Sequence, residues 1–204
     1  MTRIYILFIL TLFSSCKSIL VYTYGVRQPK IENNQSLNKF LNKYNIYTND
    51  IHVAADSVVF KELIKGGVPE AYFFDSNGVY IQYREETESC NANVTRFIDT
   101  LKAANNYPIY TDKHSNLHLD TFITKIVRLP DLNPIEFNEN FDYTIVFTWT
   151  KYIGKVSTNH LIEWQNAVTT AQERGLKIRP IYLNLDYMEH FGMMKDDLPE
   201  FDYK

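Results

Sequence analysis

The chain has 204 residues, a net charge of −3 at pH 7, 45% hydrophobic residues and 15% aromatic residues. This composition is enough to build the buried core of one ordinary domain and excludes a mainly disordered chain. No run of Lys or Arg occurs, so a nucleic-acid partner is not expected, and the two cysteines allow at most one internal disulfide.

The N-terminal residues are typical of an export signal. Arg3 precedes an uncharged apolar stretch from Ile4 to Phe13, which is shorter than the about 20 residues of a membrane-spanning helix. Two serines and Cys16 follow. This pattern resembles the signal sequence of bacterial lipoproteins, in which the cysteine receives lipid on its sulfur and its amine and becomes the mature N-terminus. The resemblance implies that residues 1–15 are removed and that acylated Cys16 anchors the protein in the lipid bilayer of a bacterial inner or outer membrane, with the domain outside the cytoplasm.

One position departs from the lipoprotein pattern. Phe13 stands where an aliphatic residue is usual. Two alternatives therefore stay open: an ordinary cleaved signal in which Cys16 is incidental, and an uncleaved anchor from Ile4 to about Tyr24. All three interpretations predict export. If Cys16 carries lipid, Cys90 has no cysteine partner within the chain.

Residues 16–35 are expected to form a tether, because the stretch GVRQPKIENN within them is polar. Ser36 is a candidate N-cap for the first helix, whose apolar face repeats at helical spacing. The stretch IHVAA then predicts a short strand, and Asp56 caps a second helix that ends at Gly66 and Gly67.

The clearest local pattern is a β-hairpin within residues 68–84. Two β-rich runs flank a turn from Asp75 to Gly78, in which Asn and Gly tolerate positive φ. A polar loop containing Cys90 leads to a further helix that carries Val94 and Ile98 on its apolar face.

The second half of the chain predicts a β-α-β unit. After a polar connection at 105–120 come two predicted strands, TFITKIVRL and DYTIVFTW, and the second is apolar enough to be buried on both faces. Ser157 is the expected cap of a long helix ending at Gly175, and KIRPIYLNL returns as a strand parallel to DYTIVFTW. We expect a single α/β domain over 36–204, with halves at 36–105 and 106–204.

A strand that ends in Trp149, followed by a loop, a long helix and another strand, resembles the front half of a thioredoxin-like domain. The hairpin and its helix resemble the back half, in which a cis-proline opens the strand; Pro69 matches that proline and Asp75 to Gly78 match the turn. The order of the halves is reversed, so the resemblance implies either a permuted domain or two incomplete thioredoxin-like units. A generic α/β sandwich is the alternative.

The chemistry of that family is not expected here. Its members carry Cys-x-x-Cys after the strand's Trp, whereas the matching residues 149–155, WTKYIGK, contain no cysteine. Dithiol exchange needs an attacking and a resolving thiol. Cys90 is the alternative catalytic residue, for a peroxidase-like or oxidoreductase-like enzyme, although three nearby glutamates disfavour a reactive thiolate.

We expect no cofactor and no metal site. His114 and His118 have metal-ligand spacing but lie among turn residues. The expected role is binding or structural work in the cell envelope, with an envelope protein or peptide as partner. In the family it resembles, the helix-start loop and the cis-proline lie side by side at the edge of the sheet. The predicted binding surface therefore comprises Pro69, Trp149 and Tyr152.

Overall fold

Apolar runs that are far apart in the sequence meet at the centre of a mixed sheet. The computed structural model describes residues 21–83, 93–102, 117–136 and 140–201. Within them, β7 (Tyr143–Trp149) pairs in parallel with β8 (Ile178–Asn184) and antiparallel with β3 (Glu70–Asp75). Every residue of β7 is buried, as expected for a strand covered on both faces.

Shorter strands extend the sheet on both sides. The seven-strand order is β4-β3-β7-β8-β2-β5-β6. Beside β3 lies β4 (Tyr80–Ile81), and beside β8 lies β2 (His52–Ala54), which is parallel to it. The strands β5 (Ile126–Arg128) and β6 (Asn133–Pro134) follow, both antiparallel to their neighbours.

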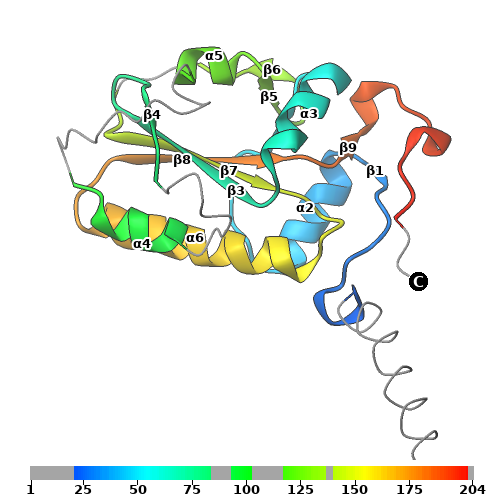
Figure 1. The fold of residues 1–204 in the computed structure, drawn as a ribbon, viewed down its shortest axis with the longest axis horizontal. Helices are drawn as coiled ribbons and strands as arrows, with labels where there is room; N and C mark the ends of the chain where they lie inside the picture. The colour runs from blue at the N-terminus through cyan, green and yellow to red at the C-terminus, as the bar shows by residue number, and fades with distance from the viewer. Residues whose placement is uncertain (1–20, 84–92, 103–116, 137–139, 202–204) are drawn as a thin grey trace, which may run out of the picture.

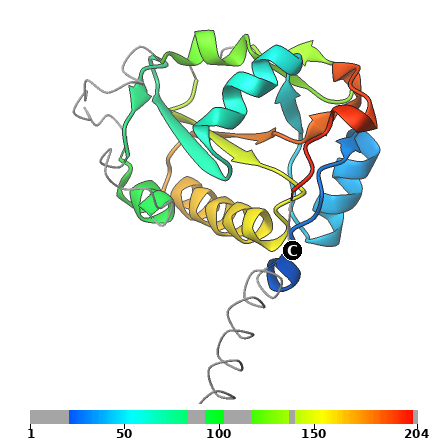
Figure 2. The same cartoon turned by 45° about the vertical axis from the view of Figure 1, so that its right-hand side comes forward.

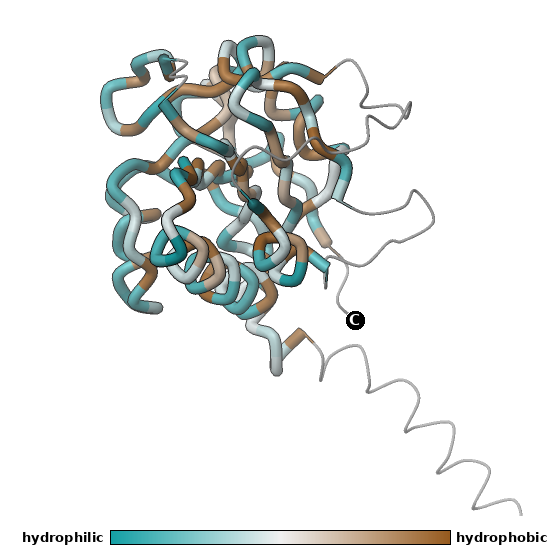
Figure 3. Tube along the Cα trace, turned by 90° about the vertical axis from the view of Figure 1, so that its left-hand side faces the viewer, coloured by the Kyte–Doolittle hydropathy of each residue, from teal (hydrophilic) through white to brown (hydrophobic). Residues whose placement is uncertain are grey.

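Helices cover both faces of the sheet (Figure 1). One face carries α2 (Asn34–Lys43), α4 (Asn93–Thr100) and α6 (Lys155–Glu173), and the other carries α3 (Ser57–Leu63) and α5 (Leu119–Ile123). Alternating residues of β3 serve the two cores: Phe73 packs with the first group and Phe74 with the second. Hydrophobic and hydrophilic segments are interspersed along the trace of the domain (Figure 3).

Several local signals in the sequence are confirmed. Asp56 is the N-cap of α3, and its carboxylate accepts hydrogen bonds from the Val58 and Val59 amides at 2.8 and 2.9 Å. The Asp75 carboxylate closes the hairpin by accepting from Asn77 and Val79, and Gly78 has φ 79°. The predicted strand–helix–strand unit of β7, α6 and β8 has the expected parallel strands.

Three local predictions are wrong. The N-cap of α2 is Asn33, not Ser36, because Asn33 and Ser36 form a reciprocal capping box with Ser36 inside the first turn. Ser157 lies within α6, where its hydroxyl accepts from the Thr150 amide. The stretch TFITKIVRL is not one strand, because Leu119, Phe122 and Ile123 share one helical face that packs against the sheet; α5 occupies its start and β5 its end.

The ends of the described chain lie against the domain. Within the expected tether, β1 (Ile31–Glu32) pairs in parallel with β9 (Tyr187–Met188). Figure 2 shows the C-terminal segment reaching back to the beginning of the described chain, where Gln28 exchanges two hydrogen bonds with the backbone of Phe201. The described residues also contain three short 3₁₀ turns: η1 (Ile64–Gly66), η2 (Glu189–Phe191) and η3 (Lys195–Asp197). Among the described residues, no helix is long and apolar enough to cross a membrane.

Candidate functional site

The structure brings Pro69 beside the loop that follows β7. The Val68–Pro69 peptide bond is cis. Glu70 pairs with Thr148, and its amide donates to the Thr148 hydroxyl at 2.8 Å. Pro69 therefore lies next to the end of β7, at the same edge of the sheet as Trp149 and the loop to α6.

Trp149 is not part of any surface, which corrects the prediction that its side chain contributes to a binding surface. Its exposed fraction is 0%, and its ring stacks on Phe40 with a centroid distance of 5.8 Å and an interplanar angle of 9°. The indole Nε1 is buried without a hydrogen-bond partner. Trp149 is a core residue because the apolar face of α2 packs directly over the end of β7.

The loop after β7 is covered by the chain itself. The Arg27 amide donates to the Tyr152 carbonyl at 2.7 Å, and the Tyr152 ring lies 5.9 Å from that of Phe201. Gly154 has φ 58°, and a Cβ there would collide with the carbonyls of Tyr24 and Gly25. Tyr152 is half-buried as a result. Both ends of the described chain thus occupy part of the predicted surface.

The remaining predicted residues give no second site. Cys16, Cys90 and His114 lie outside the described residues. His118 contacts the Asp120 carboxylate through Nδ1 at 2.6 Å, at the start of α5. No group of three or more metal-ligating side chains occurs in the described part of the chain.

A buried charged cluster sits where the parallel strands end. The Lys151 ammonium contacts the buried Glu32 carboxylate at 2.6 Å, and the Ser36 hydroxyl donates to the same carboxylate. Asp186 is also buried; it accepts from the Lys151 amide and from the Asn184 side chain, each at 2.7 Å. Burial raises the pKa of Asp186 to about 7, opposed by those two hydrogen bonds. These partners tie β1 and the loop after β8 to the loop after β7.

A pocket of about 560 Å³ lies on the other side of β8 from β7. The pocket exists because β2 pairs with β8 only at Leu183 and Asn184, whereas β7 pairs with β8 from Ile178 onward. Beside Ile178–Tyr182, the loop between α2 and β2 takes the place of a strand. We call this space the β8 pocket; its volume is within the roughly 300–1,000 Å³ typical of small-molecule sites.

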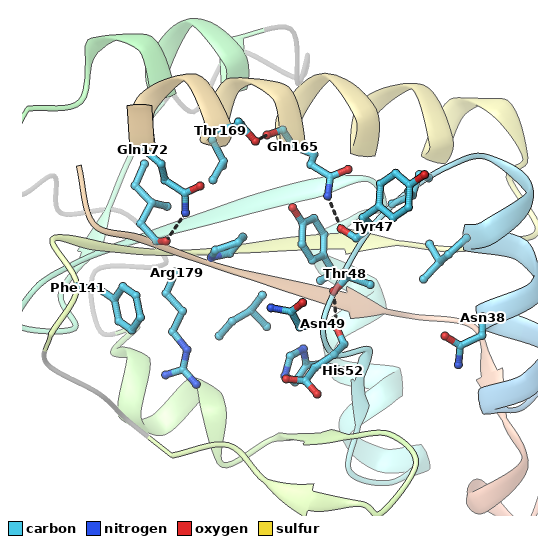
Figure 4. A pocket seen from close by; sticks show the side chains of 18 of the residues that line it. Asn38, Tyr47, Thr48, Asn49, His52, Phe141, Gln165, Thr169, Gln172 and Arg179 are labelled. Carbon is cyan, nitrogen blue, oxygen red and sulfur yellow. Dashed lines mark hydrogen bonds between the residues drawn. The ribbon is translucent and has the colours of Figure 1, made fainter. Parts of the chain in front are cut away.

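Polar side chains from three directions line the β8 pocket (Figure 4). From α6, the Gln172 amide donates to the Ile178 carbonyl at 3.0 Å, and the Gln165 amide donates to the Tyr47 carbonyl. Arg179 donates from Nη1 to the Glu136 carbonyl at 2.8 Å. The other polar side chains come from α2, the α2–β2 loop, α6 and two strands: Asn38, Asn42, Thr48, Asn49, Asp50, His52, Thr169 and Tyr182.

His52 is the unusual group of this pocket. Its side chain is 8% exposed, and its Nδ1 is buried with no hydrogen-bond partner in the structure. Burial lowers its pKa to about 4; the Arg179 and Arg128 charges act in the same direction, and Asp50 opposes them. The imidazole is therefore neutral at pH 7, with one nitrogen able to donate and the other to accept.

A second pocket of about 660 Å³ lies between α3 and the C-terminal segment, lined by Phe60, Ile64, Tyr187 and Met193 together with two lysines. It contains no buried polar atom that lacks a partner among the described residues. The β8 pocket is therefore the stronger candidate site.

Comparison with known proteins adds no assignment: no family model, curated protein or solved structure matches this chain.

Sequence reasoning missed the β8 pocket because its walls come from four separate segments. One signal was available. Pro180 interrupts an otherwise strand-like run, and a proline inside a strand indicates a position without a ladder hydrogen bond on that side.

Proposed function

We propose that this protein is a lipid-anchored lipoprotein of the bacterial cell envelope whose thioredoxin-like domain is redox-inactive and binds a small ligand. The observation that carries the binding role is the β8 pocket with the buried, unpartnered Nδ1 of His52. Buried polar atoms are normally satisfied, and a group left without a partner beside a cavity is a place for a ligand to bind.

The arrangement of the two halves supports a thioredoxin-like domain. The β3–β4 hairpin lies directly beside β7, and β7, α6 and β8 form the helix-connected parallel pair. Both halves belong to one continuous sheet. This favours one permuted unit over two incomplete ones, because each half completes the sheet of the other.

The loop sequence supports the absence of dithiol chemistry. Residues 150–154, between β7 and α6, are Thr, Lys, Tyr, Ile and Gly, so no thiol stands at the start of α6. The alternative is a thiol-dependent envelope enzyme that uses Cys90. Labelling of the folded protein with a thiol reagent separates the two, because a catalytic thiolate reacts fast at pH 7 whereas an ordinary thiol does not.

Pro69 and Tyr152 stay in the proposal as contacts for an envelope protein or peptide. Both are half-buried rather than fully enclosed, and they lie at the same edge of the sheet. The Trp149 side chain is excluded from this surface by its burial.

The anchor is tested with Cys16→Ser in the full-length chain. Each buried CH₂ contributes about 0.8 kcal/mol to membrane binding, so two or more acyl chains hold a protein firmly. We expect wild type in the membrane fraction, with lipid on Cys16 by mass spectrometry, and the variant released or retained as precursor. Cys90→Ser is the matched control and should fractionate as wild type does. Unchanged membrane association of the Cys16 variant, with no lipid on wild type, would overturn the lipoprotein assignment.

A further inference from the structure

We propose that the β8 pocket binds a neutral saccharide. This inference rests on the proposed binding role and names its ligand class. It follows from three features of the pocket: a sheet edge that cannot accept a strand, a wall without net charge, and amide side chains beside an exposed aromatic ring.

The open edge of β8 is unsuited to an extended peptide. Strand addition requires a row of backbone donors and acceptors. Pro180 lies in the middle of the open stretch and has no N–H. The carbonyl of Ile178 already accepts from the Gln172 side chain. A ligand of this pocket is therefore recognised by side chains and not by addition of a strand.

The charges of the pocket balance. Among the described residues that line the pocket, apart from the neutral His52, Asp50 and Arg179 are the only ionisable side chains of Asp, Glu, Lys or Arg, one of each sign. The neighbouring Arg128 lies 3.9 Å from Asp50 but pairs with Asp131 at 2.9 Å, so Asp50 is left to offset the charge of Arg179. His52 is neutral at pH 7 because burial disfavours its charged form. Neither an anion nor a cation would find an excess of opposite charge here, so the wall favours an uncharged ligand.

The polar groups suit hydroxyls. Asn42 and Asn49 are exposed side chains on the pocket wall, and neither makes a side-chain hydrogen bond within the described chain. A carboxamide offers both donors and acceptors, and His52 adds its unpartnered Nδ1, since its ring also makes a hydrogen bond to the Tyr182 backbone. Sugar hydroxyls also donate and accept, so adjacent hydroxyls of one ring can pair with such groups in either direction.

Tyr47 supplies an aromatic surface beside these amides. Its side chain is 75% exposed, although its backbone carbonyl is held by Gln165. Because the backbone is held in place, the solvent-exposed ring is already positioned to contact a flat apolar partner. The C–H face of a pyranose ring is such a partner, while its hydroxyls point to the sides, where the amides lie.

The test is titration calorimetry on the full-length protein in detergent, with chitotriose and maltotriose as neutral probes. Trigalacturonate serves as the acidic probe and tetra-alanine as the peptide probe. We expect at least one neutral saccharide to bind, with an affinity that 0.5 M NaCl leaves unchanged because no charge pairing contributes. Tyr47→Ala should weaken binding about five- to tenfold, the equivalent of about 1 kcal/mol of ring contact. Tyr22→Ala, which truncates a tyrosine that is 89% exposed and outside the pocket, should bind as wild type does.

Each other outcome overturns the saccharide assignment. Tighter binding of trigalacturonate that salt abolishes would show an anion site. Binding of tetra-alanine alone would contradict the saccharide but leave the binding module intact. Saccharide binding that Tyr47→Ala and Tyr22→Ala affect equally would place the site elsewhere. If neither neutral saccharide binds at its highest soluble concentration, the inference fails, whereas the Cys16 experiment tests the anchor independently.

Discussion

At the scale of single residues, burial decides which aromatic side chains are structural. Trp149 and Tyr152 are separated by only two residues, yet Trp149 lies inside the core and Tyr152 at its boundary. The difference arises because β7 ends at Trp149, under α2, whereas Tyr152 belongs to the following loop.

Trp149→Ala should therefore destabilise the domain by about 3–5 kcal/mol, the usual cost of deleting a buried aromatic ring. Tyr152→Ala should cost clearly less, because the Tyr152 side chain is only half-buried. Urea unfolding of both variants measures the two free energies. Equal losses would contradict the assignment of Trp149 to the core.

Asp186 should make stability depend on pH. Its pKa rises from 3.8 to about 7 on folding, so between these values the folded state holds a proton that the unfolded state has released. The free energy of unfolding contributed by Asp186 consequently falls as pH rises through this window, by at most about 1.4 kcal/mol per pH unit.

His52 acts in the opposite direction. Its pKa falls from 6.5 to about 4 on folding, so stability from this group rises with pH between these values. Between about pH 4 and 6.5, the free energy of unfolding of Asp186→Asn should rise with pH, because only the His52 contribution remains. That of His52→Asn should fall with pH over the same range, because only the Asp186 contribution remains. Urea unfolding at several pH values checks this. Parallel pH profiles for wild type and Asp186→Asn would show that Asp186 does not titrate as inferred.

At the scale of elements, side-chain caps hold the starts of α2 and α3. Asp56 satisfies two amides at the start of α3, a helix of 7 residues. We expect Asp56→Ala to destabilise the domain by about 1 kcal/mol, because both amides lose their acceptor. Asp56→Asn keeps an acceptor oxygen and should lose much less. Urea unfolding distinguishes them, and equal destabilisation by the two substitutions would contradict a capping role.

Elements also show where sequence patterns are insufficient. The hairpin at Asp75–Gly78 follows from short-range turn chemistry, and the structure contains it as expected. The stretch TFITKIVRL contains strand-forming residues, but its first part forms α5 because Phe122 and Ile123 fill the space over Tyr72 and Phe74. Packing overrides local propensity in such short segments.

At the scale of the whole molecule, the proposed thioredoxin-like fold would place a redox centre at the β7–α6 loop, but this loop contains no cysteine. We expect insulin disulfides to be reduced no faster with the protein and dithiothreitol than with dithiothreitol alone, because the loop contains no thiol. A turbidity assay of insulin reduction measures this, with Cys90→Ser as control. Reduction well above background that Cys90→Ser abolishes would instead support the thiol-dependent enzyme.

The sequence by itself determined the α/β class, the central strands β7 and β8, the hairpin and the Asp56 cap, because these depend on patterns of neighbouring residues. The tertiary structure alone decided that Trp149 is enclosed, that Glu32 and Asp186 converge on Lys151, and that His52, Tyr47 and Arg179 share one pocket. Most of those relations join residues that are far apart in the sequence, such as Lys151 and Glu32. They depend on which strands become neighbours and where their pairing stops, and hydrophobic periodicity carries no information about either.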